Sequence, residues 1–65
     1  MMKKYQTNDL FDKALYIACL AKMDVPAYAV DDGVMIDMEA YKTNYQGWNA
    51  PMMVRNNHRW VKELL

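Results

Sequence analysis

Residues 25–38 read VPAYAVDDGVMIDM, and this stretch decides how the chain folds. Apolar residues alternate on both sides of Asp31-Asp32-Gly33, which is the pattern of a β-hairpin with a short turn. We expect a three-residue loop at 31–33, in which Gly33 takes the left-handed conformation that such a turn needs. The register that follows would place five apolar side chains on one face of the hairpin: Tyr28, Val30, Val34, Ile36 and Met38.

The segment before the hairpin has helical periodicity. Its apolar side chains recur at spacings of three and four residues: Leu10, Phe11, Ala14, Leu15, Ala18 and Ala21. The second half of the segment is apolar almost all round, so we expect a central helix that is covered on more than one side. Thr7 or Asn8 can cap this helix, and it should end near Met23, because a proline follows three residues later. Residues 1–6 read as a frayed lead-in.

Residues 38–46 allow two interpretations. Alternation continues past the hairpin, so the second strand could extend to about Lys42. Alternatively, Asp37 could cap a short helix that Gly47 stops. We favour the longer strand because the alternation is unbroken as far as Ala40.

A last helix follows, with Asn49 as its cap and Pro51 tolerated in its first turn. One stripe of it is apolar: Met53, Trp60, Val61 and Leu64. A second stripe is basic: Arg55, Arg59 and Lys62. The sequence therefore predicts a single α+β domain over residues 1–65: N-terminal helix, β-hairpin, loop, C-terminal helix.

The composition is that of a small apolar-rich domain. The chain has 65 residues, among them seven methionines, five tyrosines and two tryptophans. A core of this size is marginal, so such a chain either dimerises or keeps an apolar face for a partner. Cys19 is the one cysteine, which excludes an internal disulfide and suggests a reducing, cytoplasmic compartment. No run of 18 apolar residues exists, so we expect no membrane span.

The sequence shows little sign of catalysis. His58 is the one histidine, and Cys19 lies in an apolar helix, so neither belongs to a cluster of convergent groups. Asp31 and Asp32 are ordinary turn residues. With two glycines in the chain, a glycine-rich phosphate loop is excluded. We expect no enzyme, no metal and no cofactor.

Three groups of residues are candidates for binding a partner. The first is the loop with Tyr45 and Trp48, where aromatic rings alternate with amide side chains; these two rings could equally fold back to cover the small core. The second is the basic stripe of the last helix (Arg55, Arg59 and Lys62), which could contact phosphate or simply be solvated. The third is the acidic hairpin tip, Asp31 and Asp32. Acidic residues concentrate before position 40 and basic ones after it, which fits head-to-tail association or two distinct partners.

A strand VPAYAV, a turn and then VMIDMEAY occupy residues 25–41. This arrangement resembles the wing of excisionase and MerR-like winged-helix proteins. Those families have a proline-alanine-tyrosine strand, a glycine turn, a second strand and an acidic cap that opens a helix.

The resemblance implies that Asp37 caps a helix through Tyr41 and Tyr45. It also implies that residues 14–22 occupy the recognition-helix position and that the chain binds DNA. Wings of this kind carry arginine or lysine towards phosphate, whereas this chain has other residues at those positions: Ala29, Asp31, Asp32 and Met35.

The leading expectation is therefore a small non-catalytic interaction protein. It would bind another macromolecule, most plausibly a protein, as phage or mobile-element inhibitors of host proteins do. A homodimer is a further expectation. The alternative is a DNA-binding accessory factor of the excisionase type.

Overall fold

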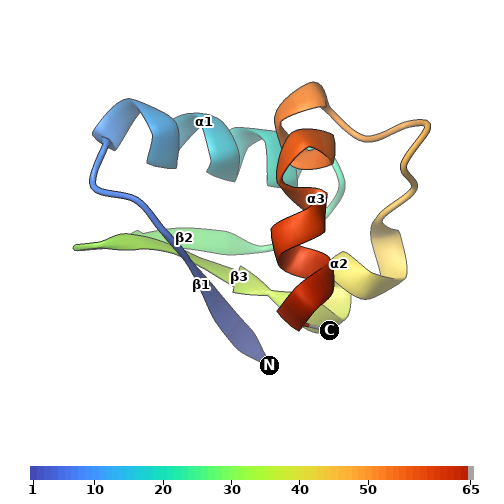
Figure 1. Ribbon diagram of the computed structural model, residues 1–65, viewed down its shortest axis with the longest axis horizontal. Coiled ribbons are helices and arrows are strands. Elements are labelled where there is room, and N and C mark those ends of the chain that lie inside the picture. Colours follow the sequence, from blue (N-terminus) through green and yellow to red (C-terminus); the bar gives the residue numbers. More distant parts are fainter. Residues whose placement is uncertain (65) are drawn as a thin grey trace.

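The computed structural model describes residues 1–64, which form a three-stranded antiparallel sheet with helices packed on one face (Figure 1). In chain order the elements are β1 (Met2–Gln6), α1 (Leu10–Ala21), β2 (Ala27–Val30), β3 (Gly33–Asp37), α2 (Met38–Asn44) and α3 (Met52–Leu64). The fold is α+β, as predicted, with an additional strand before the first helix. None of the helices in this part of the chain has the length and apolar character needed to cross a membrane.

The strand β1 is the element that the sequence analysis missed. Residues 1–6 were expected to be frayed, but β1 pairs with β3, with Lys3 opposite Ile36 and Tyr5 opposite Val34. Since β1 and β2 are both antiparallel to β3, they run parallel to each other on its two sides, joined by α1. Two lysines in β1 hide its alternation: Tyr5 is the large apolar side chain that it turns towards the helices.

The hairpin is confirmed, but its predicted register is wrong. Val30 pairs with Gly33 and Tyr28 with Met35, so the loop has two residues, Asp31 and Asp32. A shift of one residue exchanges the two faces of a strand. Tyr28 therefore lies on the outer face of the sheet and is 54% exposed, whereas Val34 and Ile36 keep the buried positions predicted for them.

Gly33 is required for a reason other than the predicted one. Neither Gly33 nor Gly47 has a positive φ, so the turn needs no left-handed glycine. A Cβ at Gly33 would instead overlap the backbone carbonyl oxygen of Tyr5 in β1. Glycine at this position lets β1 approach β3 closely.

The helix α1 begins one or two residues later than predicted. Its N-cap is Asp9, whose carboxylate accepts from the backbone N–H of Asp12, while the Thr7 hydroxyl accepts from the N–H of Asp9. The helix ends at Ala21, and Asp24 then takes a left-handed conformation with φ 58°.

The helix interpretation of the segment after the hairpin is correct, and the favoured strand extension is wrong. Asp37 caps α2 and accepts from the N–H groups of Glu39 and Ala40, so its short acidic side chain outweighs the continued alternation. Asn49 does not cap α3. The helix begins at Met52, and the carbonyl of Pro51 accepts its first hydrogen bond, from Arg55.

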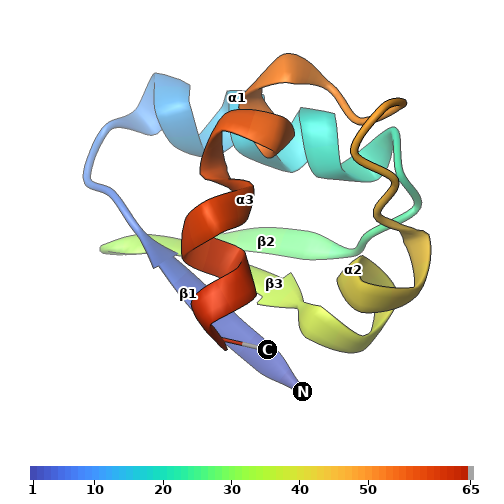
Figure 2. The same cartoon turned by 45° about the vertical axis from the view of Figure 1, so that its right-hand side comes forward.

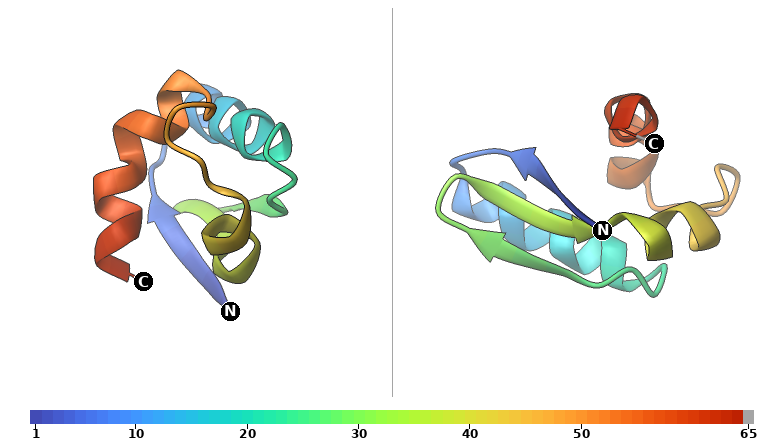
Figure 3. Two further views of the ribbon diagram at one scale, coloured as in Figure 1. Left: turned by 90° about the vertical axis from the view of Figure 1, so that its right-hand side faces the viewer. Right: turned by 90° about the horizontal axis from the view of Figure 1, so that it is seen from below.

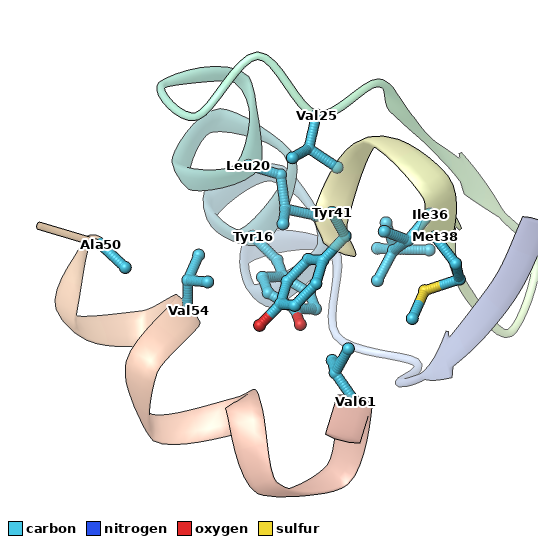
Figure 4. Close-up of a cluster of buried hydrophobic side chains, with 10 residues drawn as sticks. Tyr16, Leu20, Val25, Ile36, Met38, Tyr41, Ala50, Val54 and Val61 are labelled. Atoms are coloured by element: carbon cyan, nitrogen blue, oxygen red, sulfur yellow. The ribbon is translucent and has the colours of Figure 1, made fainter. Parts of the chain in front are cut away.

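The core lies between the sheet and the helices (Figure 4). Tyr16 and Leu20 of α1, Ile36 of β3, Tyr41 of α2 and Val54 of α3 are fully buried. Each such side chain contributes about 1.5–3 kcal/mol through removal from water. In the predicted apolar stripe of α3, Val61 is buried and Met53 and Trp60 are partly buried; the side chain of Leu64 lies outside the described part.

Candidate functional site

The hairpin tip is held by two lysines. The Lys13 side chain is buried, and its ammonium donates to the carbonyl oxygens of Val30 and Asp31, at 2.7 Å each. The ammonium of Lys4 contacts the carboxylate of Asp32 at 2.6 Å and lowers the pKa of that carboxyl below its ordinary value of 3.8. The negative charge of the predicted acidic tip is therefore partly neutralised. Asp32 is paired although its side chain is half-exposed, and Asp31 is exposed.

Sequence reasoning missed both lysines. Lys13 stands three residues before Tyr16 and seven before Leu20, on the buried face of α1. That spacing was the available signal for its burial. Lys4 has no such signal, because its role depends on the unpredicted strand β1.

Tyr45 belongs to a stack of aromatic rings rather than to an exposed loop. Its ring lies parallel to that of His58 at 3.8 Å between centroids, and Tyr41 lies 5.3 Å from Tyr45. The Tyr41 hydroxyl and His58 Nδ1 are hydrogen-bonded at 2.9 Å. Burial raises the pKa of Tyr41 well above that of an ordinary tyrosine. The stack fixes α2 against α3.

Trp48 points outward. It lies in the loop between α2 and α3 and is 82% exposed. The loop turns tightly there, since the N–H of Asn49 donates to the carbonyl of Gln46 at 3.0 Å. Tyr45 is stacked before this turn, and Ala50 is buried after it (Figure 4). Trp48 is therefore presented on a turn that is anchored on both sides.

The three basic residues of α3 are all exposed. Arg55, Arg59 and Lys62 follow one another at spacings of four and three, so they lie on the side of the helix that faces away from the core. The guanidinium of Arg55 lies 3.8 Å from the sulfur of Met52, one turn earlier. The hairpin tip and the α2–α3 loop lie at opposite ends of the molecule (Figures 1 and 2). Asp31 and Asp32 are therefore not brought together with the other predicted site residues.

The outer face of α1 is the unexpected feature of the surface. Leu10 is 79% exposed, Phe11 77% and Leu15 44%, and three alanines between and beyond them are also exposed: Ala14, Ala18 and Ala21. The expectation of a helix covered on more than one side is wrong. The sheet and α3 cover one side of α1, and the other faces solvent (Figure 3).

The described residues hold no cluster of three or more side chains suited to binding a metal ion. Tyr16, whose hydroxyl has no hydrogen-bond partner within residues 1–64, is packed edge-on against Tyr5. Burial raises its pKa, which keeps the hydroxyl neutral.

The free thiol of Cys19 is partly buried, beside a groove between α1 and the first turns of α3.

Comparison with known proteins adds no relative. No family model matches the chain, and neither a curated protein nor a solved structure is detectably similar to it.

Proposed function

We propose that this chain is a non-catalytic protein-binding module whose main contact is Trp48 together with the basic side of α3. The observation that carries the proposal is the exposure of Trp48, 82%, on a turn anchored by Tyr45 and Ala50. An exposed indole on a rigid loop loses little entropy when it binds, and tryptophan is among the commonest energetic anchors of protein interfaces.

The charge balance of the second half of the chain indicates the chemistry of the partner. From residue 40 onward the chain carries Lys42, Arg55, Arg59 and Lys62 against the single acid Glu63. Basic residues around an aromatic anchor favour an acidic surface with an apolar recess, because opposite charges accelerate the encounter and fix its orientation. The proposed partner is therefore a larger protein with such a surface. A small chain that covers it would inhibit or redirect that protein, as phage or mobile-element products do.

The hairpin tip is the weaker contact. Its acidic residues made it a candidate contact, because an acidic loop can occupy the nucleic-acid-binding groove of a partner protein. However, Lys4 pairs with Asp32, and the Lys13 ammonium lies on the neighbouring carbonyls. These lysines reduce the negative potential at the tip, and Asp31 is the residue to test there.

DNA binding of the excisionase type is the second candidate. It is supported by the three exposed cations of α3, which are spaced for phosphate contact. The turn of the would-be wing weighs against it, since it presents Asp31 to solvent, and an acidic side chain is repelled by a phosphate backbone.

The test is affinity capture with the tagged 65-residue chain in extracts of the native host, with the bound proteins identified by mass spectrometry. We expect one protein to be captured by the wild type and lost with Trp48→Ala and with Arg55→Glu/Arg59→Glu. The matched control is Tyr28→Ala, which removes an exposed aromatic ring from the outer face of the sheet. Asp31→Lys tests the hairpin tip without breaking the Lys4–Asp32 pair.

Two outcomes would contradict the proposal. One is capture that is insensitive to both Trp48 and the two arginines. The other is duplex affinity that falls steeply between about 50 and 200 mM salt, which is the signature of phosphate contacts and would favour the DNA-binding alternative.

A further inference from the structure

The solvent-facing side of α1 is apolar along its whole length. At about 100° per residue, the residues that point away from the core are Leu10, Phe11, Ala14, Leu15, Ala18 and Ala21, with Lys22 just past the helix end. A solvated helix normally carries its charged residues on this side. In α1 the two charged residues lie elsewhere: Asp12 is partly buried and Lys13 is buried. The solvent-facing side of the helix is therefore apolar.

We propose that this face binds a second copy of the same chain, with the two α1 helices packed antiparallel about a twofold axis. The proposal is independent of the Trp48 contact because it uses other residues. It goes beyond the proposed function by assigning an occupant to a surface that the Trp48 contact does not use.

The distribution of side-chain size along α1 favours this occupant. The large side chains Leu10, Phe11 and Leu15 lie in the first half of the face, and the second half carries the small residues Ala18 and Ala21. In an antiparallel pair centred near residue 15, Phe11 of each copy meets Ala18 or Ala21 of the other. Large residues then pack against small ones at both ends, which is the complementarity that a self-matching twofold interface needs.

The charges at the two ends of α1 complement each other in the same arrangement. Asp9 caps the beginning of the helix, and Lys22 follows its end. Antiparallel packing brings Lys22 of one copy to the Asp9 end of the other. The two helix dipoles also oppose each other in this arrangement, whereas a parallel pair would place like charges together.

The apolar surface extends beyond α1 onto α3. A groove between α1 and the first turns of α3 is lined by Leu15, Cys19, Met52 and Met53, with the polar residues Asp12, Asn56 and Asn57 also on its wall. Met52 is 63% exposed (Figure 2 shows the first turns of α3 crossing α1). A standard interface takes about 600–1,000 Å² from each partner, and α1 alone is only about 18 Å long. The contact with Met52 widens the interface, and we expect a dimer of modest, micromolar affinity.

The experiment is sedimentation equilibrium of the untagged full-length chain from about 5 to 500 µM, a range set around the affinity expected of a small interface. The wild type should pass from monomer to dimer within this range. Phe11→Ser should weaken association by at least about thirtyfold, as removal of a central anchor does. Tyr28→Ser, an exposed aromatic on the opposite face, should leave association unchanged.

A size exchange tests the antiparallel register. Ala18→Phe alone should weaken the dimer about tenfold or more, because two phenylalanines then collide, and Phe11→Ala/Ala18→Phe should restore most of the affinity. All of these side chains are exposed, so circular dichroism should show an unchanged fold.

A wild-type chain that remains monomeric at 500 µM would overturn the proposal, as would a dimer insensitive to Phe11→Ser. Failure of the double exchange to restore the dimer would overturn the antiparallel register. If the chain is monomeric and Phe11→Ser instead abolishes capture of another protein, a different partner occupies the face. The self-association measurements use no Trp48 variant and the Trp48→Ala capture test uses no α1 variant, so the two proposals fail separately.

Discussion

Gly33 is a residue whose predicted role is wrong. The sequence suggested a turn glycine, but the residue lies where β1 crosses close to β3, and a Cβ there would overlap the Tyr5 carbonyl oxygen. We expect Gly33→Ala to lower the free energy of unfolding by about 2 kcal/mol or more, since backbone must move to admit the methyl group. Gly47→Ala is the control: its Cβ would meet only the ring of Tyr45 at 3.4 Å or more. Urea denaturation of the two variants should separate them, and equal losses would contradict this account.

Asp24 is a residue whose substitution should stabilise the protein. It follows α1 in the left-handed conformation, at the negative end of the helix dipole, and its backbone carbonyl accepts from the side chain of Asn44. Glycine adopts this conformation without steric cost, and its backbone carbonyl can still accept the hydrogen bond from Asn44. Asp24→Gly should therefore raise the free energy of unfolding by about 0.5–1 kcal/mol, and Asp24→Val should lower it. A thermal melt that ranks valine above glycine would show that the left-handed conformation is not adopted.

The ion pair between Lys4 and Asp32 predicts a pH dependence. Lys4 lowers the pKa of the Asp32 carboxyl below 3.8 in the folded chain, so the stabilisation is present above the unfolded-state value and is lost as pH falls below it. The wild type should therefore have a higher free energy of unfolding than Asp32→Asn at pH 7. This difference should shrink towards zero as the pH falls from about 4 towards 2. Repeating the comparison in a Lys4→Met background should remove the pH dependence; its persistence there would assign the shift to another group.

At the scale of elements, the hairpin depends on α1 for its turn. Lys13 donates two hydrogen bonds to the turn carbonyls, and its side chain is 6% exposed. Lys13→Met keeps the apolar stem but removes the donor of two part-buried carbonyl oxygens, so we expect a loss of about 1–3 kcal/mol. Amide exchange in β2 and β3 should accelerate with it. Lys22→Met, at an exposed position, is the control; equal effects would mean that Lys13 does not hold the turn.

The elements with strong periodicity were predictable, and those defined by contacts were not. Helices α1 and α3 and the hairpin follow from spacing alone, because each contributes a continuous apolar face. The strand β1 forms because it pairs with β3. Its own five residues, two of which are lysines, show no alternation that would predict a strand. Asp37 allowed both a strand extension and a helix, and the capping hydrogen bonds decided for the helix.

At the scale of the whole molecule, the short chain explains which surface residues were foreseeable. Exposure of the arginines of α3 was predicted, because charged side chains stay in water. For Trp48 the sequence left burial and exposure equally open, and the structure shows exposure. The apolar face of α1 was mistaken for a buried one. A 65-residue chain has too few elements to cover α1 on every side. Its strands and α3 pack against one part of the helix surface, and the rest stays exposed.

The shortness of the chain, which leaves apolar side chains exposed, also links the fold to the proposed function. The molecule presents an exposed apolar face on α1, an exposed indole in the α2–α3 loop, and a hairpin tip at the far end from that loop (Figure 1). Surfaces of this kind lower the free energy when another macromolecule covers them. These exposed surfaces are the reason that we propose recognition of another macromolecule as the function.

The most direct test is calorimetric titration of the captured partner, once purified, with the wild-type chain and with Trp48→Ala. Because Trp48 is proposed as the central anchor, its removal should weaken binding by at least about thirtyfold, while Tyr28→Ala leaves the affinity unchanged. Equal affinities for the wild type and Trp48→Ala would contradict the central claim that the chain recognises its partner through this loop.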